Sequence, residues 1–134
     1  MSRRKTGSVS MVAVKDVEKT SKLLANLFDW QSTHGGPHVD ILVTEKKAPA
    51  LMLHEFNESD HKRFNGIKKK AKGIGQTVYV FVGDIDGVYR KVKRRKLKIV
   101  EPLWLNENND MWEFTFQIAE GYQFTACEGD GWLY

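Results

Sequence analysis

Apolar positions along the chain follow two different periods, and the change from one period to the other occurs twice. Polar and apolar side chains alternate loosely over residues 8–14, which suits a strand. Apolar residues then recur at helical spacing over residues 17–28, and Asp16 stands where a helix N-cap is expected. The same order returns in residues 76–82, a predicted strand, and residues 85–92, a predicted helix. The chain therefore begins the same strand-and-helix unit twice.

Each predicted helix is followed by further apolar runs of strand length. Three strands are predicted after each helix: residues 29–34, 39–44 and 48–56 in the first half, and residues 98–103, 111–118 and 122–128 in the second. Whether residues 29–34 form a strand stays open, because only two clear apolar runs follow the first helix. We therefore predict an α+β fold of two βαβββ modules, residues 8–56 and 76–128, joined by a polar connector, residues 57–75. We expect the two modules to form one domain over residues 1–134, with a groove between two curved half-sheets.

Composition is that of a soluble globular protein. The 134 residues are 41% hydrophobic and 28% charged, and no apolar run approaches the roughly 20 residues that span a bilayer. The basic start of the chain lacks the apolar stretch and the cleavage site of a secretory signal, so we expect a cytoplasmic protein. A single cysteine, Cys127, excludes an internal disulfide.

Positive charge exceeds negative charge and is concentrated in three runs. The formal net charge is +4, and the runs are residues 3–5, 68–72 and 90–98. We interpret them as a solvated tail, a loop and the solvent face of a helix. An anionic partner is the alternative, and it would bind less tightly as salt is added. The strand VYVFV also has the alternating aromatics of RNA-binding sheets, but the basic and glycine-containing motif of those sheets is absent, so we expect no nucleic-acid partner.

The duplicated turns and the end of the chain resemble a known superfamily. The sequence has Val-x-Asp turns at residues 14–16 and 82–84, EPLW at residues 101–104, and WEFTFQIAEGY at residues 112–122. In order and spacing these motifs resemble the vicinal oxygen chelate superfamily, which holds the glyoxalases, the bleomycin-resistance proteins and the extradiol dioxygenases. The resemblance covers nearly the whole chain from residue 8 onward, and it implies a glyoxalase/bleomycin-resistance-like fold.

Metal-dependent members of that superfamily carry ligands at positions that the resemblance aligns with Val9, Met52, Thr77 and Thr125. Valine has no donor atom, and a thioether suits only soft metals. Two neutral hydroxyls do not replace imidazole and carboxylate for zinc, nickel or iron. We therefore expect neither a metal nor another cofactor. A misaligned ligand set, and with it a metal-dependent lyase or dioxygenase, stays open as an alternative.

His54 is the candidate catalytic residue. Alternation places it on the same face as Met52, so that it would face the groove, where a histidine can act as a general base near neutral pH. A metal-free isomerase using His54 is therefore a second enzymatic alternative. The plainer interpretation is a histidine at a strand end, partly in water.

Ligand-binding candidates are the side chains that alternation turns toward the groove, together with two tryptophans near strand ends. They are Met11, Met52, His54, Thr77, Tyr79, Phe81, Trp104, Trp112, Gln123 and Thr125. Such a lining, apolar and aromatic with a few hydroxyls, is typical of small-molecule pockets, although a filled core or a dimer contact would look the same. The inward set contains no acidic residue, which favours a planar aromatic ligand, neutral or anionic, over cationic bleomycin. The resemblance implies a homodimeric small-molecule-binding protein, and whether it is an enzyme stays open.

Overall fold

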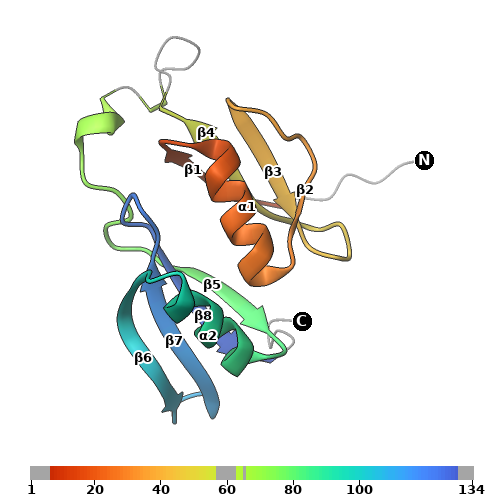
Figure 1. Cartoon of the computed structure of the whole chain (residues 1–134), viewed down its shortest axis with the longest axis vertical. Helices are drawn as coiled ribbons and strands as arrows, with labels where there is room; N and C mark the ends of the chain where they lie inside the picture. Colours follow the sequence, from red (N-terminus) through yellow and green to blue (C-terminus); the bar gives the residue numbers. More distant parts are fainter. Residues whose placement is uncertain (1–6, 57–62, 65, 130–134) are drawn as a thin grey trace. The chain divides into compact units, whose positions relative to one another are not determined.

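The computed structural model describes residues 7–56, 63, 64 and 66–129. The chain divides into two compact units, residues 1–68 and 69–134. Among these described residues, each unit has one α-helix and four strands in the order strand, helix, strand, strand, strand (Figure 1). The predicted α+β fold of two βαβββ modules is therefore confirmed.

The first unit is a four-stranded mixed sheet with one helix across one of its faces (Figure 1). Its elements are β1 (Met11–Val14), α1 (Val17–Phe28), β2 (Gln31–Ser32), β3 (Val39–Val43) and β4 (Pro49–Glu55). The strands lie in the order β1-β4-β3-β2. The first and last strands of the unit, β1 and β4, pair in parallel, and the other pairs are antiparallel.

The second unit repeats this arrangement. Its elements are β5 (Val78–Val82), α2 (Ile85–Arg94), β6 (Lys98–Asn106), β7 (Met111–Gln117) and β8 (Gln123–Glu128). The strands lie in the order β5-β8-β7-β6, again with one parallel pair, β5 and β8. A short 3-10 helix, η1 (Ile67–Lys69), precedes this sheet in the part of the chain predicted as a connector.

Helix α1 begins and ends where the sequence predicts. The carboxylate of Asp16 accepts a hydrogen bond of 3.0 Å from the backbone N–H of Lys19, so the N-cap satisfies one of the open donors of the first turn. The helix ends at Asp29, which adopts the left-handed conformation with φ 58° that terminates many helices. Between these ends, Leu24 and Leu27 are buried and form part of the first core.

A buried carboxylate, Asp40, ties strand β3 to helix α1 and to the loop before β3. Only 1% of Asp40 is exposed, and its oxygens accept hydrogen bonds from the hydroxyls of Ser21 (2.7 Å) and Ser32 (2.6 Å). Backbone N–H groups of the loop and strand, among them those of Gly35 (2.9 Å) and Ile41 (2.8 Å), donate to the other oxygen. Burial by itself raises the pKa of Asp40, but these hydrogen bonds together lower it to about 2.

The core of the second unit is a layer of aromatic rings between its sheet and α2. Phe114, Phe116 and Phe124 have no exposed surface, and successive rings in this row have centroids 5.7 Å apart. Tyr89 of α2 packs its ring edge-on against Phe114, with the centroids 4.8 Å apart. The even-numbered side chains of β7 therefore face α2.

The lengths of three strands, β1, β6 and β2, differ most from the sequence-based prediction. Strand β1 begins at Met11 rather than at residue 8, so Val9 lies before the strand and is exposed. Strand β6 continues past residue 103 to Asn106, because it pairs with β7 through a bulged antiparallel ladder. The predicted strand at residues 29–34 is present as the two-residue β2. Parts of the predicted connector (residues 57–62 and 65) and the basic run at residues 3–5 lie outside the described residues.

None of the helices in the part of the chain that the structure describes is long and apolar enough to cross a membrane.

Candidate functional site on the second sheet

The second sheet has two chemically different faces. One face packs its aromatic rings on α2, as described above. The opposite face, here called the polar face, carries the side chains of Thr77, Tyr79, Phe81, Glu101, Trp104, Asn106, Glu113, Thr115, Gln123, Thr125 and Cys127. The register places these residues on one face, since paired residues of neighbouring strands point to the same side.

Glu113 is the centre of the polar face. It is 4% exposed, and the hydroxyl of Tyr79 reaches across β8 to donate to both of its carboxylate oxygens, at 2.9 Å each. The side-chain amide of Asn106 donates to Oε1 at 3.0 Å. Within the described part of the chain, Glu113 has no basic side chain at salt-bridge distance. Two neutral donors thus hold a carboxylate that water hardly reaches.

Tyr79 is a hydrogen-bond donor at every physiological pH. Burial of the phenol, and then the hydrogen bond and the charge of Glu113, raise the pKa of Tyr79 well above its ordinary value. Its ring lies beside that of Phe81, with centroids 6.0 Å apart, and is itself partly exposed. The pair offers an aromatic surface next to the carboxylate.

A row of hydroxyls crosses the same face. Thr125 on β8 is hydrogen-bonded to Thr77 and to Thr115, at 2.9 Å in each case, and the hydroxyl of Thr115 donates to Glu101 Oε1 at 3.3 Å. The structure therefore brings together two of the positions, Thr77 and Thr125, where the superfamily resemblance implies metal ligands. Neutral hydroxyls that bond to each other do not fit zinc, manganese or iron.

No group of three histidine, cysteine, aspartate or glutamate side chains among the described residues is placed to hold a metal ion. Val9, at another of the aligned positions, is exposed ahead of β1. Cys127 on the polar face is fully buried, and burial, followed by the charges of Glu113 and Glu128, raises the pKa of its thiol. A protonated, buried thiol is a poor nucleophile.

The candidates of the first unit lie on the sheet of that unit. Met11 pairs with Met52, and Ala13 pairs with His54 two residues further along the same two strands, so Met11, Met52 and His54 share one face of the first sheet. His54 is buried and packs against Phe64, with ring centroids 5.5 Å apart. Its Nδ1 lies 2.7 Å from the backbone carbonyl oxygen of Glu55. A carbonyl only accepts, so Nδ1 carries the proton, and Nε2 is the basic nitrogen of the neutral ring.

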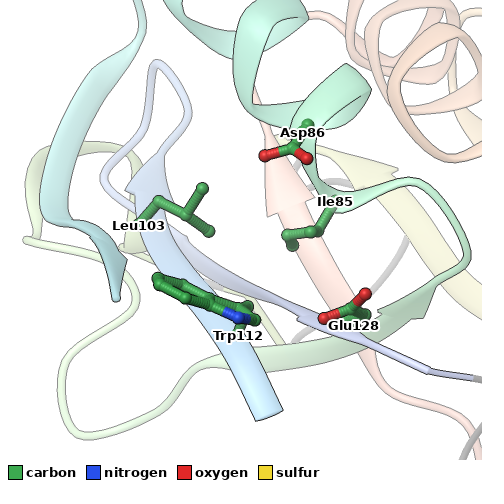
Figure 2. Close-up of a pocket in the computed structure, with 5 residues that line it drawn as sticks. All are labelled: Ile85, Asp86, Leu103, Trp112 and Glu128. Carbon is green, nitrogen blue, oxygen red and sulfur yellow. The ribbon is translucent and has the colours of Figure 1, made fainter. Parts of the chain in front are cut away.

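The two tryptophans named as ligand-binding candidates lie on opposite faces of the second sheet. Trp104 pairs with Glu113, belongs to the polar face and is 37% exposed. Trp112 pairs with Leu105, is 43% exposed, and lines a pocket on the face that carries α2 (Figure 2). Gln123 pairs with Gln117 at the start of β8 and is partly buried. The structure thus places six of the candidates on the polar face, Thr77, Tyr79, Phe81, Trp104, Gln123 and Thr125, and places Trp112 on the opposite face.

Sequence reasoning missed Glu113, Glu101, Thr115 and Asn106. The sequence contains a pattern that indicates two of them. In MWEFTFQI, aromatic residues alternate with Glu113 and Thr115, and this alternation places Glu113 and Thr115 together on the face opposite the aromatic rings. The premise that the inward face has no acidic residue is therefore wrong for the second sheet, because Glu113 and Glu101 both lie on the face of Thr125.

No protein-family model and no curated protein sequence matches this chain. Solved structures do match it over nearly its whole length. A protein of unknown function from Agrobacterium tumefaciens is 13% identical, with a TM-score of 0.76, and the match covers 96% of this chain and 98% of that one.

Two further structural neighbours have functional names. A glyoxalase/bleomycin resistance protein/dioxygenase family enzyme from Burkholderia phytofirmans is 11% identical, with a TM-score of 0.73, covering 88% of this chain and 94% of that one. The fosfomycin resistance protein FosX from Listeria monocytogenes is 13% identical, with a TM-score of 0.69, covering 96% of both chains. At these identities the likeness concerns the fold. The duplicated βαβββ modules and these neighbours together show that the chain has the fold of the vicinal oxygen chelate superfamily, as the sequence motifs predict.

Proposed function

We propose that the chain is a small-molecule-binding protein of the glyoxalase/bleomycin-resistance type, and that its polar face binds an aromatic ligand bearing an amine. The proposal includes a homodimer and the absence of metal chemistry at the aligned positions, Val9, Met52, Thr77 and Thr125. The observation that carries it is Glu113: a buried carboxylate held by two neutral donors, beside an aromatic surface.

Electrostatics favour a cationic or donor-bearing ligand. Buried charges in proteins are usually paired, because an uncompensated charge is costly to remove from water. A carboxylate has about four acceptor positions, and the described donors to Glu113 are one hydroxyl and one amide, so capacity for a further donor remains. A second carboxylate, Glu101, lies on the same face and adds to its negative potential.

The aromatic part of the ligand is supported by the rings that flank the carboxylate. Tyr79 and Phe81 lie on one strand, and Trp104 lies on the strand at the other edge of the sheet. Stacked or edge-to-face aromatic contacts add about 0.5–1.5 kcal/mol each beyond the area that they bury. This combination of rings with a few polar groups is the usual construction of a small-molecule pocket.

Nuclear magnetic resonance with matched probes tests the proposal. Benzylamine, benzyl alcohol and phenylacetate differ mainly in charge, and the indole N–H signal of Trp104 reports binding on the polar face. We expect benzylamine to shift that signal saturably, and Glu113→Gln to weaken its binding about tenfold, the loss typical of one charge-assisted hydrogen bond. Glu107→Gln, the same change at an exposed loop residue, is the matched control.

Three outcomes would contradict the proposal. Tighter binding of phenylacetate than of benzylamine would contradict the role of Glu113, and a Trp104 signal that none of the probes shifts would contradict a binding site on the polar face. Fosfomycin, an anion and the drug in the name of the FosX neighbour, is added to the panel, because tighter binding of it than of benzylamine would also contradict the role of Glu113. Stoichiometric manganese, zinc, nickel or iron in protein purified without chelator would contradict the metal-free part. Sedimentation at micromolar concentration tests the homodimer.

His54 supports a second candidate function, a metal-free isomerase. The carbonyl of Glu55 fixes the tautomer in which Nε2 is basic, which a general base requires. Solvent deuterium incorporation into a panel of 2-hydroxy ketones is the assay. We expect His54→Gln to abolish incorporation while leaving the Trp104 response to benzylamine unchanged. Incorporation that survives this substitution would exclude His54 as the base.

A further inference from the structure

A second pocket lies on the face of the second sheet that carries α2. It has a volume of about 370 Å³ and is lined by Ile85, Asp86, Leu103, Trp112 and Glu128. Figure 2 shows the indole of Trp112 and the two carboxylates arranged around the same opening, with Ile85 and Leu103 between them. The volume falls in the lower part of the range of small-ligand pockets, about 300–1,000 Å³.

The exposure of Trp112 has a simple geometric cause. Trp112, Phe114 and Phe116 follow one another on the same face of β7, and Tyr89 of α2 covers Phe114. Helix α2 begins at Ile85, one helical turn before Tyr89. The row of rings on β7 therefore extends past the N-terminal end of the helix. Trp112 is therefore left 43% exposed at the N-terminal end of α2, as the wall of a pocket.

The charge of this pocket is negative. Asp86 in the first turn of α2 and Glu128 at the end of β8 are both exposed carboxylates. The N-terminus of a helix contributes about half a positive charge, which is smaller than the two negative charges. The carboxylate of Asp84 also accepts a hydrogen bond of 3.0 Å from Gly87 N–H and offsets part of that positive charge.

We propose that this pocket, formed by Trp112, Asp86 and Glu128, is a binding site for a small organic ammonium ion. An indole face attracts a cation through its quadrupole, and flanking carboxylates add Coulombic attraction. Ile85 and Leu103 supply apolar contacts for the alkyl groups of such an ion. The site is separate from the polar face, because its residues lie on the other side of the same sheet.

Choline is the probe, and 3,3-dimethyl-1-butanol, which has nearly the same shape without the charge, is its neutral control. In a titration of the labelled full chain, we expect choline to shift the indole N–H signal of Trp112 saturably and to leave that of Trp104 in place. The neutral alcohol should bind about two- to fivefold more weakly, the contribution of a cation–π contact at a partly exposed site.

Variants assign the interaction to the named groups. Trp112→Leu should raise the dissociation constant of choline, measured by saturation transfer to its methyl protons, about three- to fivefold or more. Asp86→Asn combined with Glu128→Gln should raise it by a similar factor in low salt. Glu107→Gln, which changes an exposed carboxylate outside the lining, should have no effect.

The opposite results would overturn the inference. Equal binding of choline and the alcohol would mean that charge is not recognised. A choline response at Trp104 with none at Trp112 would place the cation on the polar face, and the absence of any saturable shift would mean that there is no site. Benzylamine binding at Glu113 is measured through Trp104, and choline binding is measured through Trp112. A negative result for choline therefore does not contradict the proposed function, and a negative result for benzylamine does not contradict the ammonium site.

Discussion

Replacing Asp40 with asparagine removes one buried negative charge and almost nothing else. Asp40 is held by two serine hydroxyls and by backbone N–H groups. The amide oxygen of asparagine can still accept from the backbone, and its NH₂ group can donate to Ser21 and Ser32, whose hydroxyls can rotate to accept. Asp40→Asn therefore preserves the packing and tests the charge itself.

The expected loss of stability on replacing Asp40 with asparagine follows from the pKa of Asp40. The hydrogen bonds lower it from 3.8 to about 2. Since a tenfold change in an acid constant is worth about 1.4 kcal/mol, the lowered pKa of Asp40 corresponds to a stabilisation of the folded state by about 2 kcal/mol. The lowered pKa means that the unfolded chain takes up the proton first as the pH falls. The stabilisation is therefore complete above pH 3.8 and is lost as the pH falls to about 2.

Urea unfolding at several pH values is the assay. Trp30 of the first unit packs on Phe28, with ring centroids 5.0 Å apart, and serves as the reporter when the other tryptophans are replaced by phenylalanine. We expect Asp40→Asn to lower the free energy of unfolding by about 2 kcal/mol at neutral pH. The difference from the parent chain should shrink below pH 3.8 and nearly vanish at about pH 2.

The matched control is Asp29→Asn, the same change at the exposed left-handed residue that ends α1. Asparagine tolerates that conformation, so we expect a change below about 0.5 kcal/mol. If Asp40→Asn costs no more than Asp29→Asn, or if its cost is the same at pH 2 as at neutral pH, the reasoning about the buried charge is refuted.

Three further predictions concern the second unit. Gly73→Ala should lower its stability by about 2 kcal/mol or more, because φ is +75° and a Cβ would lie 2.8 Å from backbone atoms; Gly75→Ala, with the same φ in open space, should cost less by thermal unfolding. Cys127, buried and with a raised pKa, should react with iodoacetamide on the order of a hundredfold more slowly in the folded protein than in urea, and equal rates would contradict its placement. Asp84→Ala should cost about 1 kcal/mol through loss of the α2 N-cap, whereas Asp84→Asn should restore most of it.

Local patterns were sufficient to predict the elements. Helix α1 lies at residues 17–28, as predicted, because an N-cap at Asp16 and a clear helical period both mark it. The second βαβββ module was predicted for the same reason, although β6 proved longer than expected. Its additional residues are held by pairing with β7, and pairing across a hairpin is not visible in the period of a single strand.

The polar interactions depend on long-range contacts and could not be predicted in the same way. Asp40 stands in the apolar run VDILVT, and its partners Ser21 and Ser32 lie 19 and 8 residues away. The contact between Tyr79 and Glu113 spans 34 residues and needs β8 between them. Alternation could have assigned Glu113 to the face of Thr125, but its hydrogen bonds needed the register.

The alternation of β7 also makes the second sheet intolerant of pairing errors. If β7 slipped by one residue against β8, Glu113 and Thr115 would point into the aromatic layer under α2, and Phe114 would lose its contact with Tyr89. Such a state would bury a carboxylate without donors while exposing rings that are now fully covered. The same residues that form the candidate site thus help to specify the register of β7 against β8, because they destabilise the two adjacent registers.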